Sequence, residues 1–156
     1  MPKKGFAILE IVVAVSIVSL ALFGLSQAAR VSLVVMNETT KRIQASFLLE
    51  EGIEAVKSMR DQSWQADINP LTAGTYYFLS FSNNRWHTGV QNVFVDKLFE
   101  RKFHLANVYR DSNDNIAGSG TLDAGTKLLT VSVAWRGHAG TTTQSISTYI
   151  ANIFSN

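Results

Sequence analysis

An apolar stretch near the N-terminus constrains the fold of this chain more than any other feature. Residues 6–29 are 24 positions with a single charged side chain, that of Glu10. A helix of about 20 apolar residues crosses the hydrocarbon core of a bilayer, which is about 30 Å thick. The stretch is therefore predicted to be a membrane-spanning helix, with Lys3 and Lys4 before it and Arg30 at its end.

Glu10 is the unusual residue in this stretch. A carboxylate on a membrane helix costs a few kcal/mol unless it reaches the interface or meets a cation, so such residues are functional candidates. The sequence around it is Gly-Phe-Ala-Ile-Leu-Glu, which runs from Gly5 to Glu10 and follows a short basic leader. The position of the carboxylate, close to the start of the apolar run, is the feature to be explained.

This hexapeptide resembles the Gly-Phe-Thr-Leu-Ile-Glu signature of type IV prepilins and pseudopilins. In that family a membrane-embedded aspartyl peptidase cleaves after the glycine and methylates the new N-terminal phenylalanine. The resemblance implies cleavage between Gly5 and Phe6, methylation of Phe6, and Glu10 as the fifth residue of the mature chain. Ala7 departs from the family pattern, where threonine is commoner. The apolar run of residues 18–25 resembles the minor-pilin branch more than a typical major pilin.

The spacing also has a physical rationale. Cleavage after Gly5 creates an α-amino group, with an ordinary pKa of about 8, at the first residue of a helix. Glu10 lies within about one turn of that helix end, where negative charge is favoured. When such helices pack with a stagger, Glu10 of one can meet the Phe6 amine of the next, a pair that sets register more than stability. Because the amine exists only after cleavage, processing can act as the switch for assembly.

The stretch allows two other interpretations. The first is an ordinary secretory signal peptide, cleaved after Ser26-Gln27-Ala28. Its apolar region would normally span 7–15 residues and contain no glutamate near its start, which argues against it. The second is a simple single-span anchor in which Glu10 reaches up to the interface. The prepilin interpretation is favoured over both, because it accounts for the hexapeptide and the span together.

The helical pattern continues beyond Arg30. An apolar stripe and a charged stripe recur at spacings of three and four, which is typical of an amphipathic helix. No proline occurs between Phe6 and Asn69, so one helix is predicted from about Phe6 to about Ser63. The apolar stripe consists of Ala45, Leu49, Ile53 and Val56, and the charged stripe of Glu50, Glu54, Lys57 and Asp61.

The rest of the chain is predicted to form an antiparallel β-sheet. The expected fold is α+β, a long N-terminal helix packed on a C-terminal sheet, as the resemblance to pilins also implies. Four regions follow: a leader (1–5), a membrane or filament-core half of the helix (6–30), an amphipathic half (31–63) and a globular head (64–156). Within the head, four strands are expected at 75–81, 99–109, 129–135 and 142–154, a connector at 69–74, turns at 82–85 and 137–140, and loops at 85–92 and 111–125.

Charge and composition exclude several functions. The chain has 14 Lys and Arg and 12 Asp and Glu, and without Lys3 and Lys4 the counts are equal at 12 each. A neutral mature chain gives no electrostatic basis for binding nucleic acid. Lys97, Arg101 and Lys102 form a small basic cluster, interpreted as part of a mixed, solvated face. The chain has no cysteine, so disulfides and thiol chemistry are excluded.

No catalytic motif is found, and the chain is not expected to be an enzyme. The three histidines are far apart and lack metal-ligand spacing. Asp111, Asn113 and Asn115 have the alternate spacing that begins a calcium loop, and some pseudopilins hold calcium in a C-terminal loop. Ile116 and Leu122 stand where an EF-hand needs glycine and glutamate, so calcium is only a weak candidate and a solvated turn the alternative. Trp64, Trp86 and Trp135 are expected in the core rather than on an adhesive surface.

The resemblance implies a structural subunit of a type IV pilus or a related secretion filament. Its implied partners are the prepilin peptidase, other pilin subunits, the platform protein and the assembly ATPase. The basic leader favours a cytoplasmic N-terminus, hence a single-pass inner-membrane protein with its C-terminus outside, and later an extracellular filament. The alternative from another class is a membrane-anchored binding or adhesion domain that does not polymerise. Substitution of Glu10 distinguishes the two.

Overall fold

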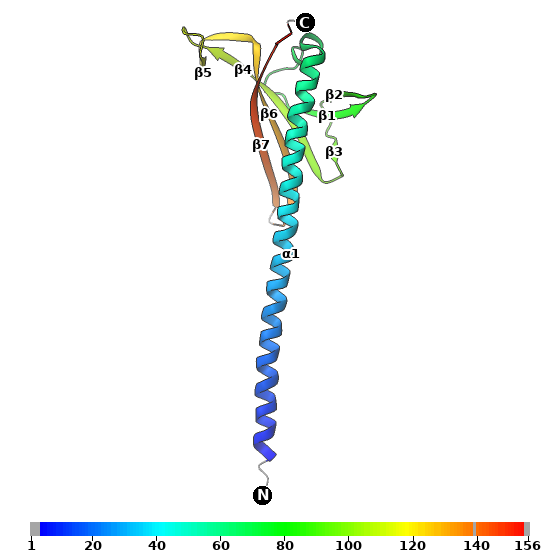
Figure 1. The fold of residues 1–156 in the computed structure, drawn as a ribbon, viewed down its shortest axis with the longest axis vertical. Helices are drawn as coiled ribbons and strands as arrows, with labels where there is room; N and C mark the ends of the chain where they lie inside the picture. Colours follow the sequence, from blue (N-terminus) through cyan, green and yellow to red (C-terminus); the bar gives the residue numbers. More distant parts are fainter. Residues whose placement is uncertain (1–3, 139, 155–156) are drawn as a thin grey trace. The chain divides into compact units, whose positions relative to one another are not determined.

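The computed structural model describes the backbone of residues 4–138 and 140–154, and side chains from Ile8 onward within these ranges. Its elements are one long α-helix, a short π-helix and seven β-strands, shown in Figure 1. The chain divides into two compact units, residues 1–40 and residues 41–156.

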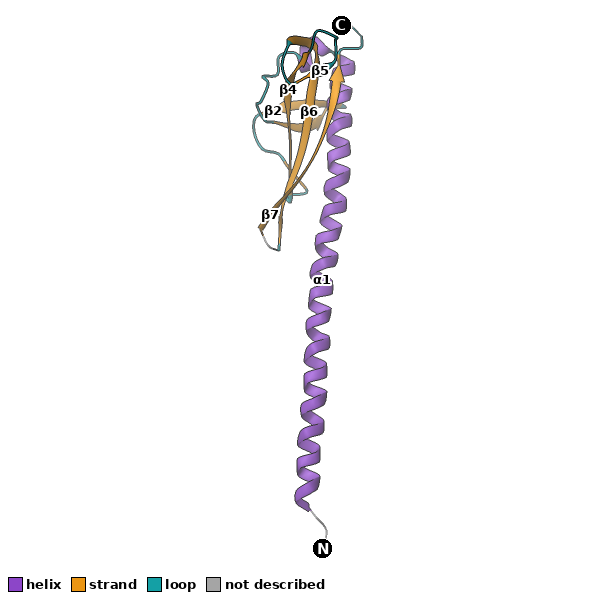
Figure 2. Ribbon diagram, turned by 90° about the vertical axis from the view of Figure 1, so that its left-hand side faces the viewer, coloured by secondary structure: helices purple, strands orange, loops and turns teal. Residues whose placement is uncertain are grey.

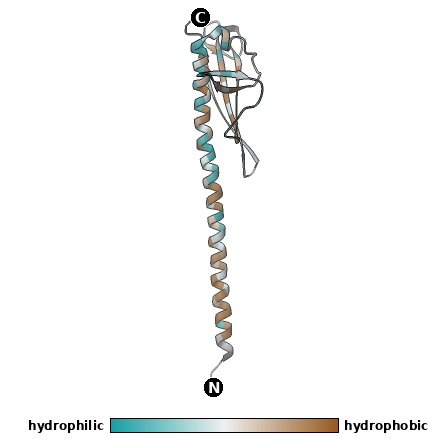
Figure 3. Ribbon diagram, turned by 90° about the vertical axis from the view of Figure 1, so that its right-hand side faces the viewer, coloured by the Kyte–Doolittle hydropathy of each residue, from teal (hydrophilic) through white to brown (hydrophobic). Residues whose placement is uncertain are grey.

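Helix α1 spans Lys4–Gln62 and contains 59 residues. The prediction of one uninterrupted helix from about Phe6 to about Ser63 is confirmed to within two residues at each end. Figure 3 shows that hydrophobic residues dominate the first part of α1, whereas hydrophilic residues become frequent further along. By length and composition α1 is the one helix among the described residues that could cross a membrane. The change in character therefore occurs within a single element.

The head contains one seven-stranded antiparallel sheet, with the order β2-β1-β4-β6-β7, while β3 and β5 pair with β4 beside this path. Figure 2 shows the strands beside the helix. The α+β fold predicted from the sequence is thus confirmed. The strands are β1 (Tyr77–Ser82), β2 (Arg85–Gly89), β3 (Phe94–Val95), β4 (Phe99–Arg110), β5 (Ile116–Ala117), β6 (Thr121–Gly137) and β7 (Gly140–Ala151).

Alternation along the long strands decides which side chains face the helix. In β4 the odd-numbered residues from Phe99 to Leu105 are buried and the intervening residues are not. In β6 the odd-numbered residues from Leu129 to Trp135 are buried in the same way. Successive side chains of a strand point to opposite faces, so one face of the sheet covers α1. The buried stripe of α1 completes this core and confirms the prediction for Ala45, Leu49, Ile53 and Val56.

Close contact between helix and sheet depends on Gly52. A Cβ atom at this position would lie 2.7 Å from Cγ1 of Val131 and 3.5 Å from Cδ of Arg101. Because carbon atoms that are not bonded do not approach so closely, α1 could not lie where it does with a larger residue there. The sequence pattern alone did not identify this glycine as a packing residue.

Residues after α1 form a turn of π-helix that was not predicted. Element η1 spans Trp64–Ile68, and Ser63 caps it by accepting a hydrogen bond at Oγ from the Ala66 N–H, at 3.1 Å. Trp64 and Ile68 are both buried and join the core. A five-residue element has too short a pattern to be read from sequence, and the buried Trp64 side chain is what fixes it against the head.

Two predicted loops were wrong, and both contain strands. Residues 85–92 include β2, which pairs with β1 through a two-residue turn at Asn83 and Asn84, both with positive φ. Such turns favour hairpins because their twist matches that of the strands. Residues 111–125 include β5 and the start of β6, which pairs with the end of β4. A register shift between Asn107 and Val108 separates this outer part of the ladder from the main one.

Candidate functional sites

The first candidate site is the N-terminal part of α1. Gly5 and Phe6, the predicted processing residues, lie in the helical backbone, but their side chains are outside the described residues. Glu10 is exposed and lies in a shallow groove of the helix surface with Leu9, Val13, Ala14 and Ile17. No cation among the side chains described from Ile8 onward forms an ion pair with Glu10. Its exposure leaves the carboxylate open to contact from outside the helix.

Apolar side chains around this part of α1 are exposed on all sides. Full burial of one large aliphatic or aromatic side chain is worth about 1.5–3 kcal/mol, so a helix of this kind requires cover. A bilayer or other helices of the same character can supply it. The exposed large residues are Ile8, Leu9, Ile11, Val12, Val13, Val15, Ile17, Val18, Leu20, Leu22, Phe23, Leu25, Val31, Leu33, Val34, Val35 and Met36.

Two serines in the same segment are satisfied within the helix. Ser16 Oγ donates to the Val12 carbonyl at 2.7 Å, and Ser26 Oγ donates to the Leu22 carbonyl at 2.8 Å. Such back-bonding to the preceding turn lets a hydroxyl enter an apolar environment without an unpaired donor. Among the side chains described from Ile8 onward, Glu10 has no comparable partner within the helix, which sets it apart from these serines.

The second candidate site is the turn between β4 and β5. Oδ1 of Asp111 accepts hydrogen bonds from the backbone N–H groups of Asn113 and Asn115, at 2.8 and 2.9 Å. Oδ2 accepts a third from Asn115 Nδ2, at 3.3 Å. These bonds, led by the one from the Asn115 backbone, hold the pKa of Asp111 below its usual value. The carboxylate thus organises its own loop.

Arg110 supplies the positive charge beside this loop. Its Nε donates to Asp123 Oδ2 at 2.7 Å, and its Nη1 donates to the Asp114 carbonyl at 2.8 Å. The hydrogen bond to Asp123 raises the pKa of the guanidinium, and the same bond is the main cause of a lowered pKa at Asp123. The Arg110 guanidinium therefore already lies against the carboxylates of Asp123 and Asp114, where a metal cation would bind.

This arrangement does not suit calcium. The ion takes 6–8 oxygen ligands, whereas here the Asp111 oxygens accept hydrogen bonds and Asn115 turns its amide nitrogen toward Asp111. In the part of the chain that the structure describes, no group of three or more His, Asp or Glu side chains could hold a metal ion. The three residues of the weak calcium candidate, Asp111, Asn113 and Asn115, are brought together as a hydrogen-bonded turn.

The basic cluster of the sequence does not form one solvated face, so that interpretation was wrong for Arg101. Arg101 is only 4% exposed, and its Nη1 lies 2.7 Å from Glu51 Oε2 on α1. Its guanidinium also lies over the Trp86 ring, 5.3 Å from the ring centroid. Lys102, on the opposite face of β4, pairs instead with Glu100 at 2.7 Å. The strand alternation of Phe99, Phe103 and Leu105 was the signal that could have placed Arg101 inside.

The prediction that the three tryptophans lie in the core is confirmed in part. Trp64 and Trp135 are each 2% exposed and belong to the core, as expected, whereas Trp86 is half-buried under Arg101. His87 lies on β2, His104 on β4 and His138 in the turn after β6. The structure does not bring the histidines together.

Comparison of the chain with known protein families, with curated proteins and with solved structures returned no match. The function of the protein is therefore inferred from its own residues.

Proposed function

We propose that this protein is a structural subunit of a type IV pilus or a related secretion filament. In this proposal the chain is cleaved after Gly5, methylated at Phe6, and assembled through the apolar part of α1. The observation that carries the proposal is a helix whose first part is apolar on every side, begins with the hexapeptide and contains one carboxylate, that of Glu10, with no ion-pair partner among the described side chains.

Glu10 is the assembly residue of the proposal. An exposed carboxylate among apolar side chains is unfavourable in a bilayer and is neutralised when a cation reaches it. The amine created at Phe6 by processing is such a cation, and in a staggered array it belongs to a neighbouring subunit. A serine at position 10 would satisfy itself within the helix, as Ser16 does. A glutamate instead makes association conditional on a correctly placed partner.

The partners and the location follow from the same proposal. A prepilin peptidase would process the chain, and the platform protein and assembly ATPase would extract it from the membrane into a polymer with other pilin subunits. Before assembly the chain would be a single-pass inner-membrane protein with residues 41–156 outside, and afterwards part of an extracellular filament. No step in this sequence requires the chain itself to be an enzyme.

Intact mass and N-terminal sequencing of the chain, recovered from membranes and from sheared filaments, test the proposal. A chain that starts at Phe6 with one added methyl group in the sheared fraction is the expected result. A start at Ala29 would indicate a secreted domain. An uncut chain that is found only in membranes would indicate a simple anchor that displays a binding or adhesion domain.

A Glu10→Ala variant tests the assembly step separately. We expect it to be cleaved and to accumulate in the membrane while it is lost from the sheared fraction. Glu54→Ala is a suitable control, because Glu54 is exposed on the head and forms only a surface pair with Lys57, which contributes little. Normal filament incorporation of Glu10→Ala would contradict the proposal.

A further inference from the structure

Strand β7 forms a long free edge of the sheet. It spans Gly140–Ala151, pairs along its whole length with β6, and ends the strand order. In the part of the chain that the structure describes, no strand pairs with its other side. Its 12 residues include no proline and no charged residue. Half of its backbone N–H and C=O groups therefore face outward along an uninterrupted edge.

Free edges are normally protected, and β7 is not. Proteins guard edge strands with short length, charged residues, proline or bulges, because an open edge pairs with other strands. The opposite edge, β2, follows this rule, since it has five residues and includes Arg85 and His87. On β7 the apolar side chains of Ile146 and Tyr149 are instead 40% and 49% exposed. An edge of this length and composition is suited to receive a further strand.

A groove runs between α1 and this edge, and its lining defines the chemistry of an occupant. Its volume is about 370 Å³, and it is lined by Ser46, Leu49, Glu50, Gln144, Ser145 and Ile146. Gln144 Oε1 is buried and accepts no hydrogen bond from the described residues. Glu50 is exposed and forms no ion pair with any described side chain. The groove thus presents two apolar side chains, those of Leu49 and Ile146, an unused acceptor, and a negative charge with no ion-pair partner among the described side chains.

We propose that the β7 edge binds an extended strand from a different protein, and that this strand bears a basic side chain directed at Glu50. Its backbone would continue the sheet beyond β7, which is the recognised mode of β-augmentation. One apolar side chain of the strand covers Ile146 and Leu49, and an N–H group donates to Gln144 Oε1. The ligand class is therefore a strand-forming, cationic peptide segment.

A second copy of this chain does not supply the chemistry that the groove requires. Its own β7 contains no charged residue, so pairing of two β7 strands would bring no cation from that strand to Glu50. The other free edge, β2, runs across the head helix whereas β7 runs along it, as Figures 1 and 2 show. Pairing β7 with β2 of a second copy would therefore cross the two helices.

Site-specific photo-crosslinking of the full-length protein in the cells that produce it tests the inference. A photoreactive amino acid replaces Ser145 on β7 in one variant, and His87 on the other edge in the control. We expect an adduct from position 145 and none from position 87. Sequencing of the adduct by mass spectrometry is expected to place the linkage in one defined segment that contains Lys or Arg. Introduction of Glu50→Lys is expected to reduce the yield of that adduct at least tenfold.

Several results would overturn the inference. They are an adduct only with another copy of this chain, an adduct only with lipid, a yield at position 145 no greater than at position 87, or a yield unchanged by Glu50→Lys. An Ile146→Lys variant provides a second check, since it adds the guarding charge that β7 lacks and is expected to abolish the adduct. Thermal unfolding of each purified variant in detergent verifies that the head remains folded.

The same cells are scored for cleavage at Gly5 and for filament incorporation. Loss of the β7 adduct with normal incorporation overturns the strand partner alone. Failure of cleavage before Phe6 overturns the proposed function alone. The strand partner is then still tested by the crosslinked segment at position 145, which must contain Lys or Arg and be lost in Glu50→Lys.

Discussion

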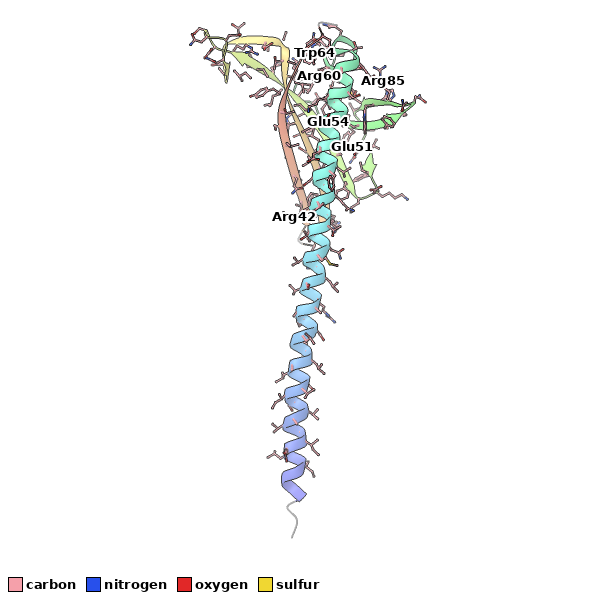
Figure 4. All side chains as sticks on the ribbon, viewed as in Figure 1. Arg42, Glu51, Glu54, Arg60, Trp64 and Arg85 are labelled. Carbon is pink, nitrogen blue, oxygen red and sulfur yellow. The ribbon has the colours of Figure 1, made fainter. Side chains whose placement is uncertain are left out.

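Arg101 of β4 is joined to Glu51 of α1, with 2.7 Å between Nη1 and Oε2. The arginine is 4% exposed and its side chain also contacts the Trp86 ring from β2. Figure 4 shows Glu51 on the part of α1 that lies beside the sheet. One buried guanidinium thus links the helix to two strands that are far apart in sequence. Arg101 Nε and Nη1 are both buried and donate no hydrogen bond of good geometry to the described residues, so the contact with Glu51 is a close charge pair, and its carboxylate is what compensates the buried charge.

Removal of the carboxylate from this pair is expected to destabilise the head. Because Glu51 is itself about half exposed, Glu51→Gln should lower the free energy of unfolding by about 1–2 kcal/mol rather than the full cost of a buried pair. Glu54→Gln, which breaks only the exposed pair with Lys57, should change it by less than about 0.5 kcal/mol. Urea denaturation of both variants in detergent measures the difference. Equal effects of the two substitutions would show that burial of Arg101 does not depend on Glu51.

Gly52→Ala is expected to destabilise the head although alanine favours helices. Alanine gains about 1 kcal/mol in helix propensity, but its Cβ would lie 2.7 Å from a buried, β-branched Val131 side chain. Overpacking costs about 1–3 kcal/mol, so we expect a net loss of about 1 kcal/mol. Gly24→Ala is the matched control, since nothing lies within 4 Å of its added Cβ. An increase in the melting temperature of Gly52→Ala would contradict the packing argument.

The turn after β4 is expected to make stability depend on pH in the acid range. The pKa values of Asp111 and Asp123 are lowered in the folded state, by hydrogen bonds from Asn115 and from Arg110 respectively. Because each carboxyl has a lower pKa in the folded chain than in the unfolded chain, where it is about 3.9, its ionised form stabilises the fold. This stabilisation is complete above the unfolded-state pKa and is lost as the pH falls through the folded-state pKa. Urea midpoints measured from pH 6 to pH 2 should fall below about pH 4. Asp123→Asn should flatten this decline, whereas Ser112→Ala, in the same turn, should leave it unchanged.

Calcium is expected to leave the head unaffected. Arg110 and the loop amides already use the carboxylate oxygens of Asp111 and Asp123. A ligand stabilises a protein only through binding to the folded state, so millimolar calcium or a chelator should shift the melting temperature by less than about 1 °C. A calcium-dependent rise that disappears in Asp111→Asn would instead establish a metal site at this turn.

Residues 41–156 are expected to fold without the apolar part of α1. All buried apolar side chains among the described residues lie between Ala45 and Ile150, and this segment is one compact unit. Expressed alone, it should remain soluble without detergent and unfold in a single cooperative transition, measured by circular dichroism. Aggregation or a gradual transition would show that the head needs residues 1–40 for its core.

The sequence by itself determined the features that depend on local pattern. The apolar stretch, the stripes of α1 and the alternation in residues 129–135 are periodic over several turns or pairs. Together with the strand composition of residues 99–109, they predicted the helix, its buried stripe and the main strands. The hexapeptide from Gly5 to Glu10, with its carboxylate, is also a local feature, and it carries the functional proposal.

Only the tertiary structure decided which distant residues meet. β2 and β5 exist because β1 and β4 offer them a pairing edge, and their own residues read as turn or loop. Arg101 is buried because Glu51 and Trp86 reach it from other elements, and Gly52 matters because Val131 approaches it. The free edge of β7 likewise follows from the strand order. Such contacts join residues tens of positions apart, and the pattern around each residue contains no information about its partner.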